Sequence, residues 1–222
     1  MNQPPPRASL GRLHVITDEL LQTRLSHAEV AKLALAGGAD TIQYREKRPL
    51  PTRQLVEAAA AVVAACGDAG AASIVDDRAD VTAAVGATGV HLGRHDLEVQ
   101  VARRLLGDGF LIGGTANSIE EARRVFAGPV DYLGVGPVFG TASKANPARV
   151  MGLEVLRRIC AESPVPVIAI GNITADRVED VLATGAYGVA VLSGITCAAD
   201  PAEAAHGYSE RIKVWLAGSR TG

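Results

Sequence analysis

Short apolar stretches rich in β-branched residues recur along the chain, and longer segments with helical spacing separate most of them. Such a stretch between turn residues is typical of a buried strand, whereas apolar positions three and four residues apart indicate a helix. Eight strands are predicted, at Leu13–Thr17, Thr41–Tyr44, Ser73–Val75, Gly89–His91, Leu111–Gly113, Tyr132–Val135, Val167–Ile170 and Gly188–Val191. The predicted helices include Glu29–Ala36, Gln54–Cys66, Leu97–Leu106, Glu120–Phe126, Leu153–Cys160 and Arg177–Leu182. The chain therefore alternates between strand and helix.

Turn and cap residues stand at the ends of these predicted helices. Ser118 followed by Glu121 has the spacing of a capping box, which begins a helix. Glycines stand where helices should end, namely Gly37, Gly107, Gly128 and Gly185. Similar turns at 37–40, 86–89 and 185–188 each lead from a helix into an apolar strand. This recurrence indicates a repeated βα unit.

Eight βα units predict an α/β protein with one domain, a (β/α)8 TIM barrel, whose strands are buried on both sides. The alternative is an open doubly wound sheet, which predicts a glycine-rich dinucleotide turn after the first strand. The chain has Thr-Asp-Glu-Leu at 17–20 instead, which favours the barrel. We expect the barrel to span 11–217, with a disordered N-terminal tail over 1–10 and a C-terminal tail over 218–222.

Composition and charge exclude several classes of protein. The chain has 22 Lys and Arg against 24 Asp and Glu, so no basic excess favours nucleic acid or anionic lipid. The longest apolar stretch, Ala58–Cys66, is about half of the roughly 20 residues that a bilayer requires. The proline-rich start does not resemble a signal peptide, and the three cysteines are far apart. We expect a cytoplasmic protein without membrane or nucleic-acid partners; whether it is a homo-oligomer stays open.

Polar residues follow the second predicted strand, where a barrel places its active site. Strand alternation puts Gln43, Arg45 and Lys47 on one face and points Tyr44 and Glu46 the other way. Three hydrogen-bond donors, two of them cationic, would converge on an anion. The alternative is a solvated strand end that forms ion pairs with Glu46 or another neighbour.

Two carboxylates follow the third and fourth strands, which are neighbours in a barrel of sequential topology. Asp77 and Asp96 can therefore approach each other, and a cation between them would relieve their repulsion. Oxygen ligands with room for water and phosphate suit Mg²⁺. The alternative is that each aspartate caps the helix that follows it.

Two further loops have features of phosphate sites. After the sixth strand, Thr141, Ser143 and Lys144 offer hydroxyls and a positive charge in a long loop, which could equally be an ordinary surface loop. Asn172 follows the seventh strand, and Asn tolerates the left-handed backbone that close approach to phosphate often needs. The loops after the last two strands of a barrel commonly bind phosphate.

The histidines give weaker signals. His91 lies in an apolar strand and is interpreted as a hydrogen-bonded barrel residue and not as a base. His14, His27 and His206 have no partner at a recognisable spacing.

Five motifs in order resemble the thiamine phosphate synthase family, from Leu13 to Ile195. They are Gln-x-Arg-x-Lys after the second strand, Asp-Arg-x-Asp after the third, Gly-Val-His-Leu-Gly-x-x-Asp at the fourth, Gly-Val-Gly-Pro with Thr-x-Ser-Lys at the sixth, and the pair Gly-Asn-Ile and Leu-Ser. The resemblance implies that 4-amino-2-methyl-5-hydroxymethylpyrimidine diphosphate and 4-methyl-5-(2-hydroxyethyl)thiazole phosphate are joined, releasing pyrophosphate. It also implies a dissociative mechanism assisted by Mg²⁺.

The resemblance also implies a role for each matching residue. Asp77 and Asp96 would hold Mg²⁺, and Gln43 would contact the pyrimidine. The implied diphosphate ligands are Arg45, Lys47, Thr141, Ser143 and Lys144. The backbone at Asn172, Leu192 and Ser193 would hold the thiazole phosphate. The substrate-binding set is completed by Asp76, Thr115 and Gly152. The expected catalytic residues are Lys47, Thr115 and Lys144.

Several positions depart from the family pattern. The departures are Asp76 for Asn, Arg94 for Gln, Thr115 and Asn117 where Ser-x-His is common, Gly140 for Pro and Asn172 for Gly. One hypothesis is that the charge of Arg94 offsets that of Asp76. A related thiazole tautomerase and a non-catalytic barrel that binds a phosphorylated ligand remain as alternative functions.

Overall fold

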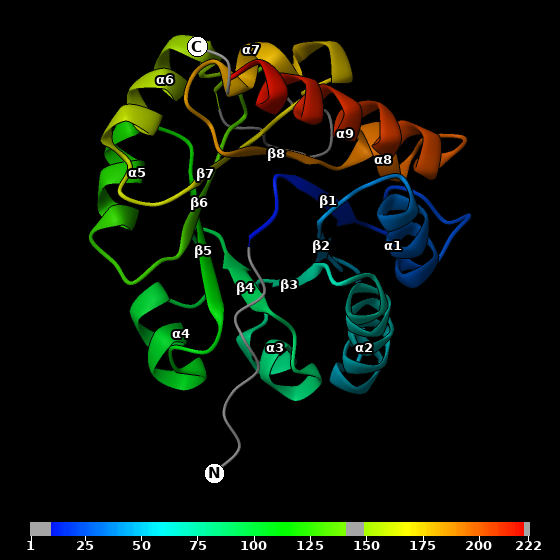
Figure 1. Cartoon of the computed structure of the whole chain (residues 1–222). Coiled ribbons are helices and arrows are strands. Elements are labelled where there is room, and N and C mark those ends of the chain that lie inside the picture. The colour runs from blue at the N-terminus through cyan, green and yellow to red at the C-terminus, as the bar shows by residue number, and fades with distance from the viewer. Residues whose placement is uncertain (1–9, 141–148, 220–222) are drawn as a thin grey trace.

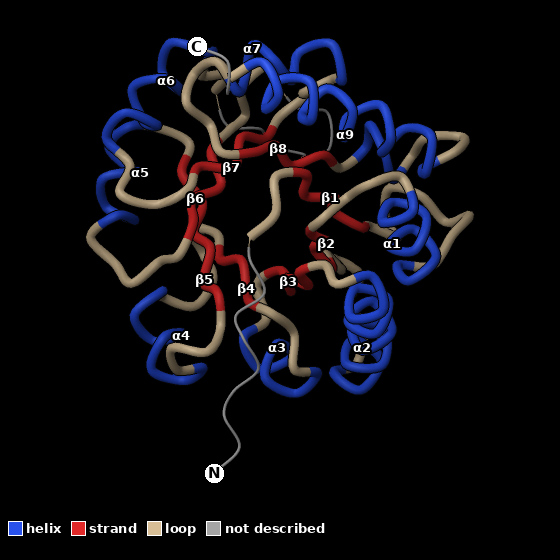
Figure 2. Tube along the Cα trace, viewed as in Figure 1, coloured by secondary structure: helices blue, strands red, loops and turns tan. Residues whose placement is uncertain are grey.

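A closed barrel of eight parallel strands forms the centre of the molecule, with helices arranged around it (Figures 1 and 2). The computed structural model describes residues 10–140 and 149–219. The strands are β1 (Leu13–Thr17), β2 (Thr41–Tyr44), β3 (Ala72–Asp76), β4 (Gly89–Leu92), β5 (Leu111–Ala116), β6 (Tyr132–Val135), β7 (Val167–Ile170) and β8 (Gly188–Val191). The helices are α1 (His27–Ala36), α2 (Thr52–Ala69), α3 (Ala79–Val85), α4 (Val99–Leu106), α5 (Ile119–Phe126), α6 (Gly152–Glu162), η1 (Ala175–Arg177), α7 (Val178–Leu182), α8 (Ser193–Thr196) and α9 (Pro201–Gly218). The predicted TIM barrel is confirmed.

All eight predicted strands are present, and β3, β4 and β5 are longer than predicted. The largest difference is in β5, which was predicted to end at Gly113 and continues to Ala116. It continues because it pairs with both neighbours, Gly113 with His91 of β4 and Ala116 with Val135 of β6. Glycine is required at 113, since a Cβ there would lie 2.1 Å from a ring atom of Tyr132.

The predicted helix starts are partly confirmed. Ser118 accepts a hydrogen bond from the backbone of Glu121, which is half of the predicted capping box. The other half is missing because the Glu121 carboxylate accepts from the backbone of Asn117 at 2.8 Å instead. The complete capping box lies at Ser26 and Glu29, at the start of α1. The C-terminal helix α9 begins at Pro201, after the side-chain cap Asp200.

Apolar side chains fill the barrel and the layer between barrel and helices. Ile16, Tyr132, Ile168 and Ala190 form a buried cluster contributed by β1, β6, β7 and β8. A larger cluster packs α1, α2, α6, α7 and α9 against the strands. No helix in residues 10–140 and 149–219 combines the length and apolar character needed to cross a membrane. The rigid wall of strands presents its carboxyl ends, and the side chains that follow them, at one mouth of the barrel.

Candidate active site

Three side chains from the end of β2 converge on Asp76, the last residue of β3. Gln43 Nε2 donates to Asp76 Oδ1 at 2.7 Å. Lys47 Nζ and Arg45 Nε lie 2.9 Å and 3.7 Å from Asp76 Oδ2. The prediction that Gln43, Arg45 and Lys47 lie on one face is therefore confirmed. The carboxylate of Asp76, on the neighbouring strand, holds both cations in place.

Asp18 completes the arrangement of cations and was not identified from the sequence. It is 1% exposed, follows β1 directly, and its Oδ2 accepts from Arg45 Nη1. Its Oδ1 accepts from the backbone N–H groups of Leu20 and Leu21 at 2.8 Å and 3.2 Å. The sequence around Asp18 indicates only a turn, because its partner Arg45 follows the next strand, β2.

Asp77 and Asp96 come together at the mouth, as the sequence predicts. Lys47 donates to Asp77, and the carboxyl groups of Asp77 and Asp96 are hydrogen-bonded to each other. Burial and the contact with Asp77 raise the pKa of Asp96. Burial also opposes the charge on Asp77, but the hydrogen bonds from Lys47 and Asp96 outweigh it and lower the pKa of Asp77. Two carboxyl groups this close repel each other when both are charged, and the contact favours charge on Asp77 over charge on Asp96.

Helix capping does not explain these two aspartates. The N-cap of α3 is Arg78 and that of α4 is Glu98, and neither helix start has a side-chain cap hydrogen bond. Asp96 Oδ2 instead accepts from the backbone of Gly93 at 2.7 Å. Asp77 adopts a φ of 63°, which few residues other than glycine tolerate. The backbone is held in an uncommon conformation that projects Asp77 toward Asp96.

The paired carboxylates fit a hard divalent cation. They supply oxygen ligands from two neighbouring strand ends, and a cation between them would relieve the repulsion of their charges. Mg²⁺ commonly binds through one or two protein carboxylates and keeps several waters. The role of Mg²⁺ stays a prediction.

Thr115 faces the barrel interior next to a histidine. Its Oγ1 lies 2.8 Å from His91 Nε2, and His91 Nδ1 lies 3.1 Å from the hydroxyl of Tyr132. His91 is thus a hydrogen-bonded barrel residue, as interpreted from the sequence. The catalytic role of Thr115 stays a prediction.

The residues expected to bind the second phosphate lie across the mouth from β3. Asn172 follows β7 with a φ of 49°, which confirms the predicted left-handed conformation. Leu192 and Ser193 follow β8, the neighbour of β7 in the barrel.

Gly152 begins α6 with a φ of 73° and donates its N–H to the carbonyl of Val138 at 3.1 Å. Thr141, Ser143 and Lys144 lie outside the described residues.

Known proteins resemble the chain over almost all of the barrel. Residues 13–195 match the family model described as thiamine monophosphate synthase. The chain is 49% identical over 205 residues to the thiamine-phosphate synthase of Salinibacter ruber, covering 91% of this chain and 90% of that protein. It is 47% identical over 200 residues to that of Methanoculleus marisnigri, covering 90% and 94%. The chain belongs to the thiamine monophosphate synthase family.

A solved structure agrees with membership of the thiamine monophosphate synthase family. The thiamine phosphate pyrophosphorylase of Pyrococcus furiosus matches with a TM-score of 0.84 and 38% identity, covering 92% of this chain and 96% of that one. The predicted family, enzyme class and fold are therefore confirmed.

Arg94 is one of the positions that depart from the family pattern, and a neighbouring carboxylate balances its charge. Arg94 forms an ion pair with Glu121 and lies 3.3 Å from Asn117 Oδ1. The charge of Asp76 is balanced by Lys47 and by Arg45. Arg94 is therefore paired with a carboxylate on α5, and the hypothesis that its charge offsets that of Asp76 stays a prediction.

The outward face of the β2 end holds a second charged group that sequence reasoning missed. We call Glu19, His27, Glu46 and Arg48 the outer cluster. Arg48 Nη2 donates to Glu19 Oε2 at 2.6 Å and also to Glu46, while His27 Nε2 lies 3.2 Å from Glu46 Oε2. His27 Nδ1 lies 2.7 Å from the hydroxyl of Thr17. His27 therefore has side-chain partners, and spacing along the chain did not reveal them because Thr17 and Glu46 lie on other elements.

The outer cluster predicts a specific dependence of stability on pH. Burial would raise the pKa of Glu46, but hydrogen bonds from Arg48 and His27 and the charge of Arg48 lower it to about 2. A folded-state pKa below the unfolded value stabilises the fold above pH 4.5, and this contribution is lost as pH falls toward 2. We expect the contribution of Glu46 to decrease by about 1.4 kcal/mol between pH 5.5 and pH 3.5.

Urea unfolding of the wild type and Glu46→Gln at both pH values measures this effect. The free energy of unfolding of the wild type should decrease more than that of the variant. Equal decreases in the two proteins would contradict the assignment. Glu154→Gln is the control, because Glu154 is an exposed partner of Arg157 on α6.

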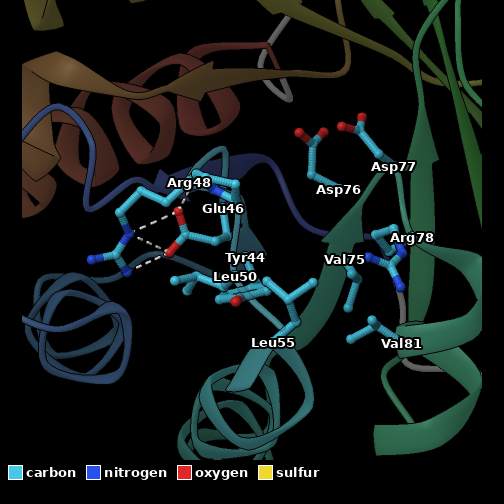
Figure 3. Close-up of a pocket in the computed structure, with 11 residues that line it drawn as sticks. Tyr44, Glu46, Arg48, Leu50, Leu55, Val75, Asp76, Asp77, Arg78 and Val81 are labelled. Carbon is cyan, nitrogen blue, oxygen red and sulfur yellow. Dashed lines mark hydrogen bonds and ion pairs between the residues drawn. The ribbon is translucent and has the colours of Figure 1, made fainter. Parts of the chain in front are cut away.

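A cavity of about 230 Å³ lies beside the outer cluster, between β2, β3, α2 and α3. Figure 3 shows Tyr44 beside Leu50 and Leu55 at this cavity, with Arg48 and Glu46 on one side and Arg78 on the other. The Tyr44 hydroxyl is buried and is the one buried side-chain polar atom in residues 10–140 and 149–219 without a hydrogen-bond partner.

Removing this hydroxyl should stabilise the protein. A buried hydroxyl without a partner costs about 1–3 kcal/mol. We therefore expect Tyr44→Phe to raise the free energy of unfolding by about 1 kcal/mol while keeping the ring against His27, 4.6 Å away between centroids. Chemical denaturation measures the change, and Tyr208→Phe is the comparison, because its hydroxyl donates to Ile173 at 3.0 Å and its loss should destabilise. A less stable Tyr44→Phe protein would show that the hydroxyl has a partner in solution.

Proposed function

We propose that this chain joins 4-amino-2-methyl-5-hydroxymethylpyrimidine diphosphate to 4-methyl-5-(2-hydroxyethyl)thiazole phosphate, giving thiamine phosphate and pyrophosphate. Membership of the thiamine monophosphate synthase family supports the reaction class. The observation that carries the proposal is the position of Arg45 and Lys47 beside the paired carboxylates of Asp77 and Asp96. Cations next to a site for a hard metal ion suit a diphosphate that has to depart.

The substitution breaks one C–O bond and forms one C–N bond. The bond between the pyrimidine methylene and the diphosphate breaks, and its electron pair leaves with the pyrophosphate. The lone pair of the thiazole nitrogen then bonds to the methylene carbon. Bound Mg²⁺ would neutralise part of the charge on the diphosphate. Arg45 and Lys47 would bind the diphosphate oxygens and hold them more strongly as negative charge develops.

Carboxylates of the protein itself hold these two cations in place. Arg45 is paired with Asp18, and Lys47 with Asp76 and Asp77. A diphosphate would replace Asp77 as the partner of Lys47 when Asp77 binds the metal ion. Because the side chains are already positioned, little conformational entropy is lost on binding.

Gln43 and Asp76 would orient the pyrimidine. Gln43 is 6% exposed and its amide is fixed by the hydrogen bond to Asp76. The Asp76 carboxylate can accept from the amino group of the pyrimidine, as the amide oxygen of the more usual Asn would. The thiazole phosphate would bind across the mouth at the backbone of Asn172, Leu192 and Ser193.

Pyrophosphate release tests the proposal. The assay contains both substrates, each alone, and both with EDTA in place of Mg²⁺. Release that requires both substrates and Mg²⁺ is expected, and thiamine phosphate should form in equal amount. A thiazole tautomerase would change the thiazole without releasing pyrophosphate, and a non-catalytic barrel would bind the substrates without turnover.

A further inference from the structure

The two faces of the β2 end carry charges with different environments. Arg45 and Lys47 point to the mouth, and Glu46, which lies between them in sequence, points to the outer cluster. The side chain of Glu46 is 1% exposed, compared with 32% for Lys47. A shift of the backbone at Glu46 would therefore move both neighbouring cations.

Arg48 fastens this segment through several bonds. Its Nε lies 3.0 Å and 2.9 Å from the two carboxylate oxygens of Glu46, and its backbone N–H donates to Glu46 Oε1 at 2.8 Å. Its Nη2 donates to Glu19, whose Oε1 accepts from the backbone of His27 at 2.8 Å. The guanidinium thus ties the β2 end to the β1 end and to the start of α1. Figure 3 shows the bonds between Arg48 and Glu46.

The outer cluster also has the spacing of a metal site, but its chemistry favours the guanidinium. Glu19, His27 and Glu46 present ligand atoms within 4.8 Å of one another. Arg48 already donates to both carboxylates, and its fixed charge and planar donors match them. A metal ion would have to displace a paired cation. The arrangement is therefore a support for the loop.

We propose that Glu46 and Arg48 are positioning residues for diphosphate binding. Together with Glu19 they fix the backbone at 45–47 so that Arg45 and Lys47 reach the same anion. This inference deepens the proposed function and rests on the proposed role of the two cations. Neither positioning residue contacts the diphosphate.

Binding of inorganic pyrophosphate in the presence of Mg²⁺, measured by calorimetry, tests positioning without requiring turnover. Glu46→Gln is decisive because the loss of charge and the loss of position change the Kd for pyrophosphate in opposite directions. Loss of a negative charge near an anion site would by itself strengthen binding, whereas loss of position weakens it. We expect the Kd to rise about fivefold in Glu46→Gln and about tenfold in Arg48→Met, which loses every guanidinium bond.

Two further variants separate positioning from a general loss of structure. Arg123→Met, which removes an exposed ion pair with Glu162, should leave the Kd within twofold of the wild type. In a Lys47→Ala background, Arg48→Met should change the Kd less than threefold, because Lys47, one of the two cations that Arg48 positions, has been removed. If Arg48→Met does not fold, Glu46→Gln combined with Arg48→Met avoids an unpaired buried carboxylate and should still raise the Kd.

The outcomes distinguish this inference from the proposed function. A wild-type protein that binds pyrophosphate and shows the expected Kd changes without catalysing release would overturn only the proposed function. Tighter pyrophosphate binding in Glu46→Gln would overturn the positioning role, and so would unchanged binding in Arg48→Met or in its combination with Glu46→Gln. An effect of Arg48→Met on the Kd that is as large in the Lys47→Ala background as in the wild type would also overturn it. So would a wild type that does not bind pyrophosphate. In the active enzyme, Arg48→Met should raise the KM for the pyrimidine diphosphate and leave that for the thiazole phosphate within twofold.

Discussion

Asp77→Asn is expected to lower kcat/KM by about 10³-fold at low millimolar Mg²⁺, which is at the upper end of the effect of removing one electrostatic group from an active site. The variant loses a carboxylate expected to bind Mg²⁺ and a partner of Lys47. Asparagine also tolerates the left-handed φ of 63° at this position, so the fold should be kept. Steady-state kinetics over a range of Mg²⁺ concentrations measures the loss, and excess Mg²⁺ should restore part of the activity.

Asp80→Asn is the matched control for this variant. Asp80 lies three positions away in sequence, is exposed, and is paired with Arg78 instead of with the mouth residues. It should keep activity within twofold. An Asp77→Asn enzyme with more than a third of wild-type activity at low Mg²⁺ would exclude Asp77 as a metal ligand.

Lys47→Ala is expected to lower kcat/KM by about 10²–10³-fold, because a positive charge that faces the departing diphosphate is removed. The KM for the pyrimidine diphosphate should rise by at least about tenfold, a loss of about 1.4 kcal/mol in binding. The KM for the thiazole phosphate should change little, since its expected site is across the barrel. Initial rates with each substrate varied in turn give both constants.

Lys213→Ala is the control for loss of a lysine, because Lys213 is exposed on α9 and paired with Glu210. Its kinetic constants should equal those of the wild type. Equal increases in both KM values for Lys47→Ala would instead indicate a general disturbance of the mouth, and unfolding curves of the two variants would show whether the fold is weakened.

The fold was largely predictable because its signals are local. Short apolar strands, helical spacing and repeated glycine turns specify βα units, and eight such units close into a barrel. The end of β5 was not predictable from its own residues, since its extension to Ala116 depends on pairing with β4 and β6.

The inward face of the site was also predictable, because strand alternation has a period of two residues. It placed Gln43, Arg45 and Lys47 together, and sequential topology brought Asp77 to Asp96. The partners of these charges were not predictable. Asp18 and Arg45 are 27 positions apart in the chain, and their contact depends on the distance between strand ends.

The sequence by itself determined the repeated unit, the barrel and the polar residues at its mouth, since each follows from spacing along a strand or helix. Only the tertiary structure decided which charges pair. It joined His27, Glu46 and Arg48 in one cluster and Arg94 with Glu121 in another. An ion pair depends on the separation of two side chains in space, and for groups on different elements that separation is set by packing and strand register.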